Sequence, residues 1–449
     1  MRTLEMRTNM LMTWMKRGVP LFLALGCGCL AQDAAPLKLT LKDAVDLALK
    51  QNPLVILANL DVSESEQDRQ LARSALMPQV DGTLSEAINR LNVRALIGLS
   101  FPGIPEHVGP FEVFQGGVGF KAPLFDLTLW RRYKSSQKGI DSRRAQELSV
   151  REESVLLVVS QYLGCQRAAA DVAAAQSRAD LAQAFFDQSA DLQKNGVGTG
   201  IDTLRANVQL QNEKQRVIVA HTELDTSLYG LSRLLNVDPH RPIEIADQVS
   251  FFDTPDVSVD QTIEKAFATR PELRAVHSEE QRAALDARAA GEERLPKVSF
   301  SGFWMEQGLT PSTIIPAYQY QWSLDVPVFT GGRIGAERAK ADLALRQLAQ
   351  QEQELRNRIA LEVKTAAAQV AAARNEVTVA NLGVDLARQE VDQARDRFQA
   401  GVTNNIEVIT AQDELARAND NQIAALYRYN QARADLAHAA GQMEALYAK

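Results

Sequence analysis

The sequence predicts a mostly α-helical protein with a membrane β-barrel part, and three observations support this fold class. The 449-residue chain is internally duplicated, so that its two halves share one order of motifs. Each half contains heptad patterns much longer than a globular domain needs. Each half also contains two short segments in which apolar and polar residues alternate, as in strands that face lipid on one side.

The N-terminus has the pattern of an export signal. A basic pair at 16–17 precedes an apolar run at 19–30, which is shorter than the about 20 residues that a spanning helix needs. We therefore predict a signal peptide over 1–31. Two processing routes stay open, namely ordinary cleavage after Ala31 and lipidation of Cys27 in a lipobox-like stretch.

Composition argues against nucleic-acid binding and against catalysis. The net charge is −7, with 49 basic and 56 acidic residues, and no basic run is present. The five histidines are scattered without metal-ligand spacing, and the sequence has no nucleophile elbow. The glycine-rich stretch 196–200 joins two predicted helices and lacks a lysine in nucleotide-loop spacing. We expect no enzyme activity, no cofactor and no metal site.

The duplication sets the domain boundaries. The stretch 41–53 recurs as 259–271, at an offset of 271 − 53 = 218, and Pro78 and Pro296 keep this offset. Each copy reads as helix, β segments, long helix, glycine-containing turn and long helix, with Thr40 and Ser258 as expected N-caps. The predicted units are a first repeat over 32–235, a linker over 236–258 and a second repeat over 259–449.

The later motifs recur at a smaller offset. Pro123 matches Pro327, since 327 − 123 = 204, and Gly196 matches Gly401 at an offset of 205. The first copy therefore contains 218 − 204 = 14 additional residues, which we expect in an outer loop. The β-hairpins are predicted at about 79–122 and 297–326, and the helical hairpins at about 126–235 and 334–440.

A heptad seam runs along the first helix of the second helical hairpin. It alternates β-branched residues with alanines, which lets helices approach closely. At about 1.5 Å per residue such a helix reaches about 100 Å, as a coiled coil or a helical tube requires. The seam consists of Val363, Ala366, Val370, Ala373, Val377, Ala380, Val384, Ala387, Val391, Ala394 and Phe398. Cys165 falls on the same seam in the first copy, where we expect it to be a packed core residue.

The alternating segments predict strands with one lipid-facing side. Trp304, Tyr318, Tyr320 and Trp322 are the expected aromatic residues of the membrane interfaces. An open sheet edge in lipid leaves backbone groups unpaired, at several kcal/mol each. Four strands are too few to close a barrel, so several copies must share one. The residues themselves leave a dimer with eight strands and a trimer with twelve both open.

Taken together, these motifs resemble the TolC-like outer membrane efflux protein family. The resemblance covers nearly all of the mature chain and depends on the paired openings, on the junction 327–333 and on the turn 397–408. It implies a homotrimer with an α-helical barrel and a shared twelve-stranded β-barrel. It also implies a place in the outer membrane with a long periplasmic portion, and two partners, a periplasmic adaptor and an inner-membrane pump.

The implied function is passive conduction of drugs, metals or other solutes from the pump across the periplasm and the outer membrane. Two alternatives are an exit duct for polypeptides in type I secretion and a secreted coiled-coil structural protein without a pore. The resemblance also implies a periplasmic tip that contacts the adaptor, formed by Gly196, Val197, Gly198, Thr199, Gly200, Ile201, Gly401, Val402 and Thr403.

The resemblance finally implies an acidic gate just past the second turn. Glu407 occupies the first gate position, Thr410 stands where some members have a second acid, and Asp202 is the matching residue of the first copy. Three Glu407 carboxylates around one axis would repel one another and attract cations. The alternative is that Glu407 is a solvated residue stabilised by the helix N-terminus.

Overall fold

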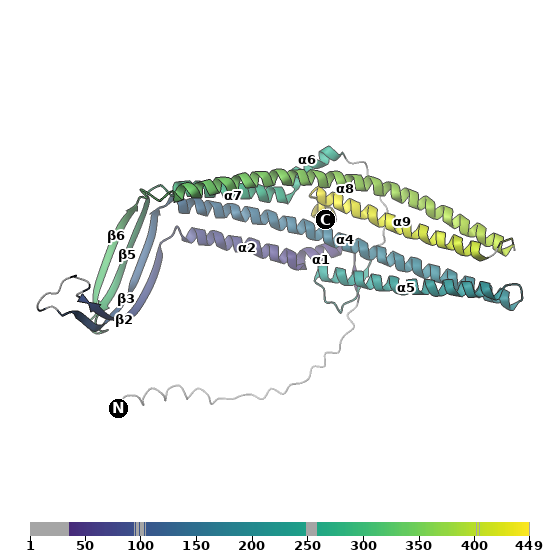
Figure 1. The fold of residues 1–449 in the computed structure, drawn as a ribbon, viewed down its shortest axis with the longest axis horizontal. Helices are drawn as coiled ribbons and strands as arrows, with labels where there is room; N and C mark the ends of the chain where they lie inside the picture. Colours follow the sequence, from purple (N-terminus) through teal and green to yellow (C-terminus); the bar gives the residue numbers. More distant parts are fainter. Residues whose placement is uncertain are drawn as a thin grey trace, which may run out of the picture.

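The structure is a computed structural model that describes residues 36–93, 105–247, 258–400 and 405–448, with a few single residues in between. The predicted signal peptide with Cys27, residues 248–257 of the predicted linker and Gly401 lie outside the described residues. The molecule is elongated, with a sheet at one end and two helical turns at the other (Figure 1).

The elements follow the duplicated order that the sequence predicts. The first half contains β1 (Leu37–Leu39), α1 (Leu41–Gln51), α2 (Pro53–Ser74), β2 (Gln79–Asn92), β3 (His107–Phe125), α4 (Leu127–Lys194), α5 (Gly200–Leu235) and β4 (Ile243–Ile245). The second half contains α6 (Val259–Thr269), α7 (Pro271–Glu292), β5 (Lys297–Gly308), β6 (Ile315–Asp325), α8 (Arg333–Gln399), α9 (Asn405–Ala439) and α10 (Met443–Tyr447). No helix within the described ranges is long and apolar enough to cross a bilayer.

Side-chain caps begin several of the helices. Thr40 and Asp43 form a capping box at α1, and Asp126 caps α4 by accepting hydrogen bonds from two backbone N–H groups at 2.9 and 3.2 Å. Thr199 caps α5. Ser258 is the N-cap residue of α6, as expected, but its side chain makes no capping hydrogen bond. The first-turn acid Asp260 still complements the dipole of that helix.

The four long strands form one antiparallel sheet in the order β2-β3-β5-β6. The two hairpins have the same register: Val80 faces Phe120 in the first, and Val298 faces Leu324 in the second. These residues are related by the offsets 218 and 204 that the sequence alone contains. The two hairpins therefore match each other residue by residue. The edges of the sheet are β2 and β6.

The heptad seam is buried along most of α8. Val363, Val377, Val384 and Val391 are each at most 4% exposed, because they face the return helix α9. The matching position in α4, Cys165, is fully buried, as expected. Burial raises the pKa of the Cys165 thiol, so this thiol is packed and unreactive.

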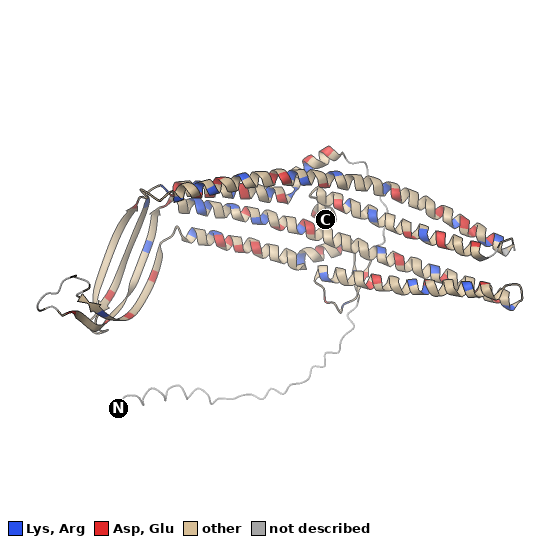
Figure 2. Cartoon of the chain, in the orientation of Figure 1, with Lys and Arg blue, Asp and Glu red and all other residues tan. Residues whose placement is uncertain are grey.

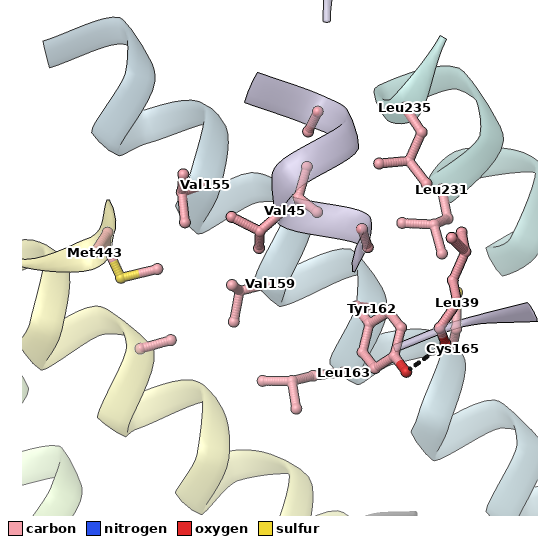
Figure 3. Packing of buried hydrophobic residues seen from close by; sticks show 14 of the residues in the cluster. Leu39, Val45, Val155, Val159, Tyr162, Leu163, Cys165, Leu231, Leu235 and Met443 are labelled. Atoms are coloured by element: carbon pink, nitrogen blue, oxygen red, sulfur yellow. Dashed lines mark hydrogen bonds between the residues drawn. The ribbon is translucent and has the colours of Figure 1, made fainter. Parts of the chain in front are cut away.

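The largest apolar cluster lies midway along the helices, where α1, α4, α5 and α10 meet (Figure 3). Tyr162 of α4 is fully buried there. Its hydroxyl lies 3.0 Å from the carbonyl oxygen of Leu39 and 3.0 Å from Oδ2 of Asp247. These bonds fasten the small parallel pair of β1 and β4 to the outside of α4. Burial raises the pKa of Tyr162, so it stays a neutral donor.

Candidate functional site

One face of the sheet is aromatic and uncovered. Trp304 faces Tyr318 across the β5–β6 pair, and Tyr320 and Trp322 follow on the same side because side chains alternate along a strand. All four are between 55% and 70% exposed. The rings of Trp304 and Tyr318 stack at 5.8 Å between centroids. The four aromatic residues that the sequence singled out therefore lie together on one face.

The first hairpin extends this apolar face. Val80, Leu84 and Ile88 of β2 and Val118 of β3 lie on the same side and are exposed. The opposite side is polar, with a ladder of side-chain hydrogen bonds along β6 that includes the one from Gln319 to Gln321. Charged residues are sparse on the strands and frequent on the helices (Figure 2). One side of the sheet is thus suited to lipid and the other to water.

A glycine permits the close packing of this face. A Cβ on Gly302 would lie 2.6 Å from the carbonyl oxygen of Gln319 and within 3 Å of the rings of Phe120 and Tyr320. The two rings therefore cover the space above Gly302. Gly82 differs, because the nearest atom to a Cβ there would be 3.9 Å away.

The turns at the far end of the helices expose apolar side chains. Gly196 adopts the left-handed conformation at φ 76°, and the N–H groups of Val197 and Gly198 both donate to the carbonyl of Leu192. This arrangement closes the end of α4 as a Schellman-type cap does. Val197 and Val402 point outward in the two turns, at 77% and 70% exposed. The described part of the predicted tip also includes Thr199, Gly200, Ile201 and Thr403.

Close to the turns, an apolar cluster joins the two helical hairpins. The ring centroids of Phe185 in α4 and Phe398 in α8 lie 6.0 Å apart. Val391, Val408 and Ala411 are buried around them. Sequence reasoning predicted the two hairpins separately and missed this contact between them. Phe398, the aromatic residue at the end of the seam in α8, was the available signal.

The predicted gate residues lie in the first turns of α9 and α5, where each has a local partner. The Glu407 carboxylate accepts a hydrogen bond from the Thr403 hydroxyl and lies 3.0 Å from Nε of Arg397. Its side chain is 40% exposed. The hydroxyl of Thr410 donates to the carbonyl of Ile406 at 2.9 Å, so Thr410 bonds back to its own helix.

Asp202 belongs to the cap of α5. Its carboxylate accepts a hydrogen bond from the Thr199 hydroxyl at 2.5 Å and lies 3.8 Å from Nη1 of Arg205. Asp202 and Glu407 thus have matching positions and matching partners, namely a hydroxyl before the helix and one arginine.

A polar cavity of about 710 Å³ lies between α4, α5 and α9, above the tip cluster. Arg178 lines it and makes an ion pair with Asp420 at 2.8 Å. Glu213 lies 3.8 Å from Nε of Arg178, is 3% exposed and accepts a hydrogen bond from Arg216 at 3.1 Å. Sequence reasoning did not reveal this network, because its members are far apart in the chain. Within the described ranges, no cluster of three or more metal-ligating side chains exists.

An exposed aromatic sheet joined to long helical hairpins is the architecture of outer-membrane exit ducts. The chain matches the model of the outer membrane efflux protein family over residues 44–237 and 262–442. It therefore belongs to this family, and the predicted resemblance to TolC-like proteins is confirmed. Its class of function is efflux through the outer membrane, and the helical hairpins form its long periplasmic portion.

Known relatives agree with this assignment. The alkaline protease secretion protein AprF of Pseudomonas aeruginosa is 24% identical over 454 residues, which cover 98% of this chain and 90% of AprF. The CmeC outer membrane channel of Campylobacter jejuni shares the fold with a TM-score of 0.78 at 17% identity, over 90% of this chain and 85% of CmeC. The outer membrane protein VceC of Vibrio cholerae has a TM-score of 0.75 at 16% identity, over 89% of this chain and 96% of VceC.

Proposed function

We propose that three copies of this chain form one passive exit duct, which receives solutes from an inner-membrane pump through a periplasmic adaptor. The observation that carries the proposal is a four-stranded sheet with an exposed aromatic face and two free edges, β2 and β6. In lipid, a single copy of such a sheet would leave the backbone groups of both edges unpaired.

The closure argument supports several copies. Unpaired backbone groups in a bilayer cost several kcal/mol each, and bacterial barrels contain at least eight strands. Three copies would supply twelve strands and would bring together twelve long helices as a tunnel. The number three follows the TolC-like family that the motifs resemble. A mass of three chains for the detergent-solubilised protein would support this proposal, and a stable mass of one chain would refute it.

The two turns are the proposed contact with the adaptor. Val197, Ile201 and Val402 are apolar side chains that stand exposed at the tip. An exposed apolar patch of this kind marks a protein contact. Replacing Val197 and Val402 together by aspartate is expected to abolish adaptor binding without changing the mass of the purified protein.

Glu407 is the proposed gate residue. In a trimer its three carboxylates would lie around the axis, each next to an Arg397 that offsets part of the charge. Glu407→Ala would therefore weaken cation preference and divalent block in single-channel recordings. The matched control is Glu376→Ala, since Glu376 also pairs with one arginine, Arg428, at 2.8 Å, but far from the turns. Unchanged selectivity in Glu407→Ala would contradict the gate.

The likeness to AprF favours a second candidate, export of polypeptides. AprF is a protease secretion protein by name, and this chain aligns with almost its whole length. A host lacking its own duct distinguishes the two. Restored drug resistance would support solute efflux, and restored release of a secreted polypeptide would support the second candidate.

A further inference from the structure

A groove of about 770 Å³ lies on the second half of the chain, where α6, α8, α9 and α10 meet. This volume falls within the usual range of small-molecule pockets. Much of the lining is apolar and includes Val259 of α6, Val370 of α8 and Leu436 of α9. Leu446 of α10 also lines the groove and is 61% exposed. The groove is therefore an open apolar surface that is separate from the sheet, the turns and the polar cavity.

The duplication shows why this groove is open. On the first half, the outer side of α4 packs against β1 and Asp247, and the Tyr162 hydroxyl points toward Leu39 (Figure 3). At the offset of 205, three large and buried residues of α4 correspond to three alanines that line the groove. The pairs are Tyr162 with Ala367, Leu163 with Ala368, and Gln166 with Ala371. The groove on α8 is therefore the space that larger side chains fill on α4.

The charged side chains of the groove are all basic. Its described lining residues include no aspartate or glutamate, and its four basic residues are Lys265 of α6, Lys364 and Arg374 of α8, and Arg433 of α9. Lys265 and Lys364 are exposed, and neither ammonium group has an ion-pair partner within the part of the chain that the structure describes. The whole chain has a net charge of −7. A groove with this charge is complementary to an anion.

The polar cavity above the tip differs in this respect. Its lining contains acidic and basic side chains together, and Arg178 pairs there with Asp420. Its charges thus offset one another inside the chain. The described lining of the groove on α8 contains no such compensating acid, so a bound anion is the complement that this groove lacks.

We propose that this groove binds a long-chain fatty acid. The carboxylate lies among the basic groups, next to Lys265 and Lys364, and the alkyl chain lies along Ala367, Ala371 and Leu436. The carboxylate forms charge-assisted hydrogen bonds with the lysines, and the alkyl chain removes apolar surface from water. A small polar anion would leave the apolar lining uncovered, and a neutral lipid would leave the cations unpaired. The proposal goes beyond the duct and does not depend on it.

Equilibrium dialysis of radiolabelled laurate tests the proposal. The protein is the full chain in a neutral detergent that is present on both sides of the membrane. We expect saturable binding of about one laurate per chain. Octanoate is four methylene groups shorter and should bind at least tenfold more weakly. Dodecyltrimethylammonium has the same alkyl length and a positive head group, so it should not compete with laurate.

Variants that refill the groove locate the binding site. Ala367→Tyr introduces the residue of the first half and should abolish laurate binding, because the ring takes the space of the alkyl chain. Ala368→Leu makes a smaller change of the same kind and keeps the test valid if the first variant does not fold. The matched control is Ala372→Tyr, since Ala372 is exposed on α8 and does not line the groove. The control should bind laurate as the parent does.

A second pair of variants tests the role of charge. Lys265→Gln/Lys364→Gln should weaken laurate binding about fivefold, because each exposed ion pair contributes modestly. The matched control is Lys42→Gln/Lys50→Gln, which removes the same charge from exposed positions of α1, the equivalent of α6. This control should leave the affinity unchanged. Equal weakening by both double variants would overturn the assignment of the carboxylate to the groove.

The remaining outcomes also decide the proposal. Laurate binding that survives both Ala367→Tyr and Ala368→Leu, or equal binding of laurate and dodecyltrimethylammonium, overturns it. Absence of saturable binding by the unaltered protein overturns it as well. In that case, binding gained by Phe251→Ala/Phe252→Ala would assign the groove to the predicted linker, which contains both residues. Binding found only in protein whose mass is one chain would assign it to a second copy. None of these results bears on the proposed duct.

Discussion

Arg270, between α6 and α7, is a buried residue whose ion pairs allow a quantitative test of stability. Its side chain is 5% exposed and lies 2.9 Å from Glu362 and 3.1 Å from Glu272. Its guanidinium also donates to the carbonyl of His438 at 3.0 Å. It thereby connects the α6–α7 step to α8 and to the end of α9. Arg270→Met keeps the apolar stem and removes the charge and all three contacts.

The size of the effect follows from what the substitution leaves behind. Removing one partner of a fully buried pair costs about 3–5 kcal/mol. The carboxylates of Glu272 and Glu362 are 28% and 38% exposed, so both can regain water, and we expect a loss of about 2 kcal/mol. Arg358 pairs with Glu354 at 3.5 Å on the exposed side of α8, and its loss should cost at most about 1 kcal/mol.

Thermal unfolding of the detergent-solubilised protein is the assay. The melting temperature of Arg270→Met should fall by about 2 °C, and that of Arg358→Met should stay within about a degree of the parent. Adding Glu362→Gln to Arg270→Met should recover part of the loss, because the carboxylate left unpaired is then removed. Equal melting temperatures for the two arginine variants would refute the reasoning.

Three further predictions concern other parts of the chain. Tyr162→Phe should lower the free energy of unfolding by about 1–2 kcal/mol, since it removes the buried hydroxyl that bonds to Leu39; an unchanged free energy of unfolding would contradict it. Gly302→Ala should lower the yield of heat-resistant oligomer on gels, because its Cβ overlaps backbone, whereas Gly82→Ala should not; equal yields would count against the packing described. Burial and the nearby guanidinium lower the pKa of His438, so the unfolded chain takes up its proton first and stability falls as pH drops below about 6.5. His438→Gln should therefore lose less melting temperature than the parent between pH 7.5 and 5.5, and parallel losses would refute this.

Much of the fold could be predicted because each motif that determines it occurs in both halves of the sequence. Two prolines at 78 and 296 give one offset and two at 123 and 327 give the other, and these offsets reproduce both hairpin registers. The lipid side was readable from Trp304 to Trp322 because side chains alternate strictly along a strand. Long seams and period-two alternation are local signals, so a single sequence contains them.

Contacts between distant segments could not be predicted in the same way. The three-residue strand β1 pairs with β4, about 200 positions later, and such short strands show no periodicity. The pairing of Glu407 with Arg397 depends on how the turn folds between them. The missing side-chain hydrogen bond at Ser258 shows that a favourable residue at the N-cap does not by itself form the capping bond.

The central claim is that this chain is a duct rather than a closed rod of helices, and conductance tests it most directly. The purified protein should be reconstituted into liposomes loaded with a small dye, with Gly302→Ala protein as the assembly-impaired control. We predict dye release that rises with the amount of assembled protein and is lower for the variant. A protein that stays a water-soluble single chain and never releases the dye would contradict the claim.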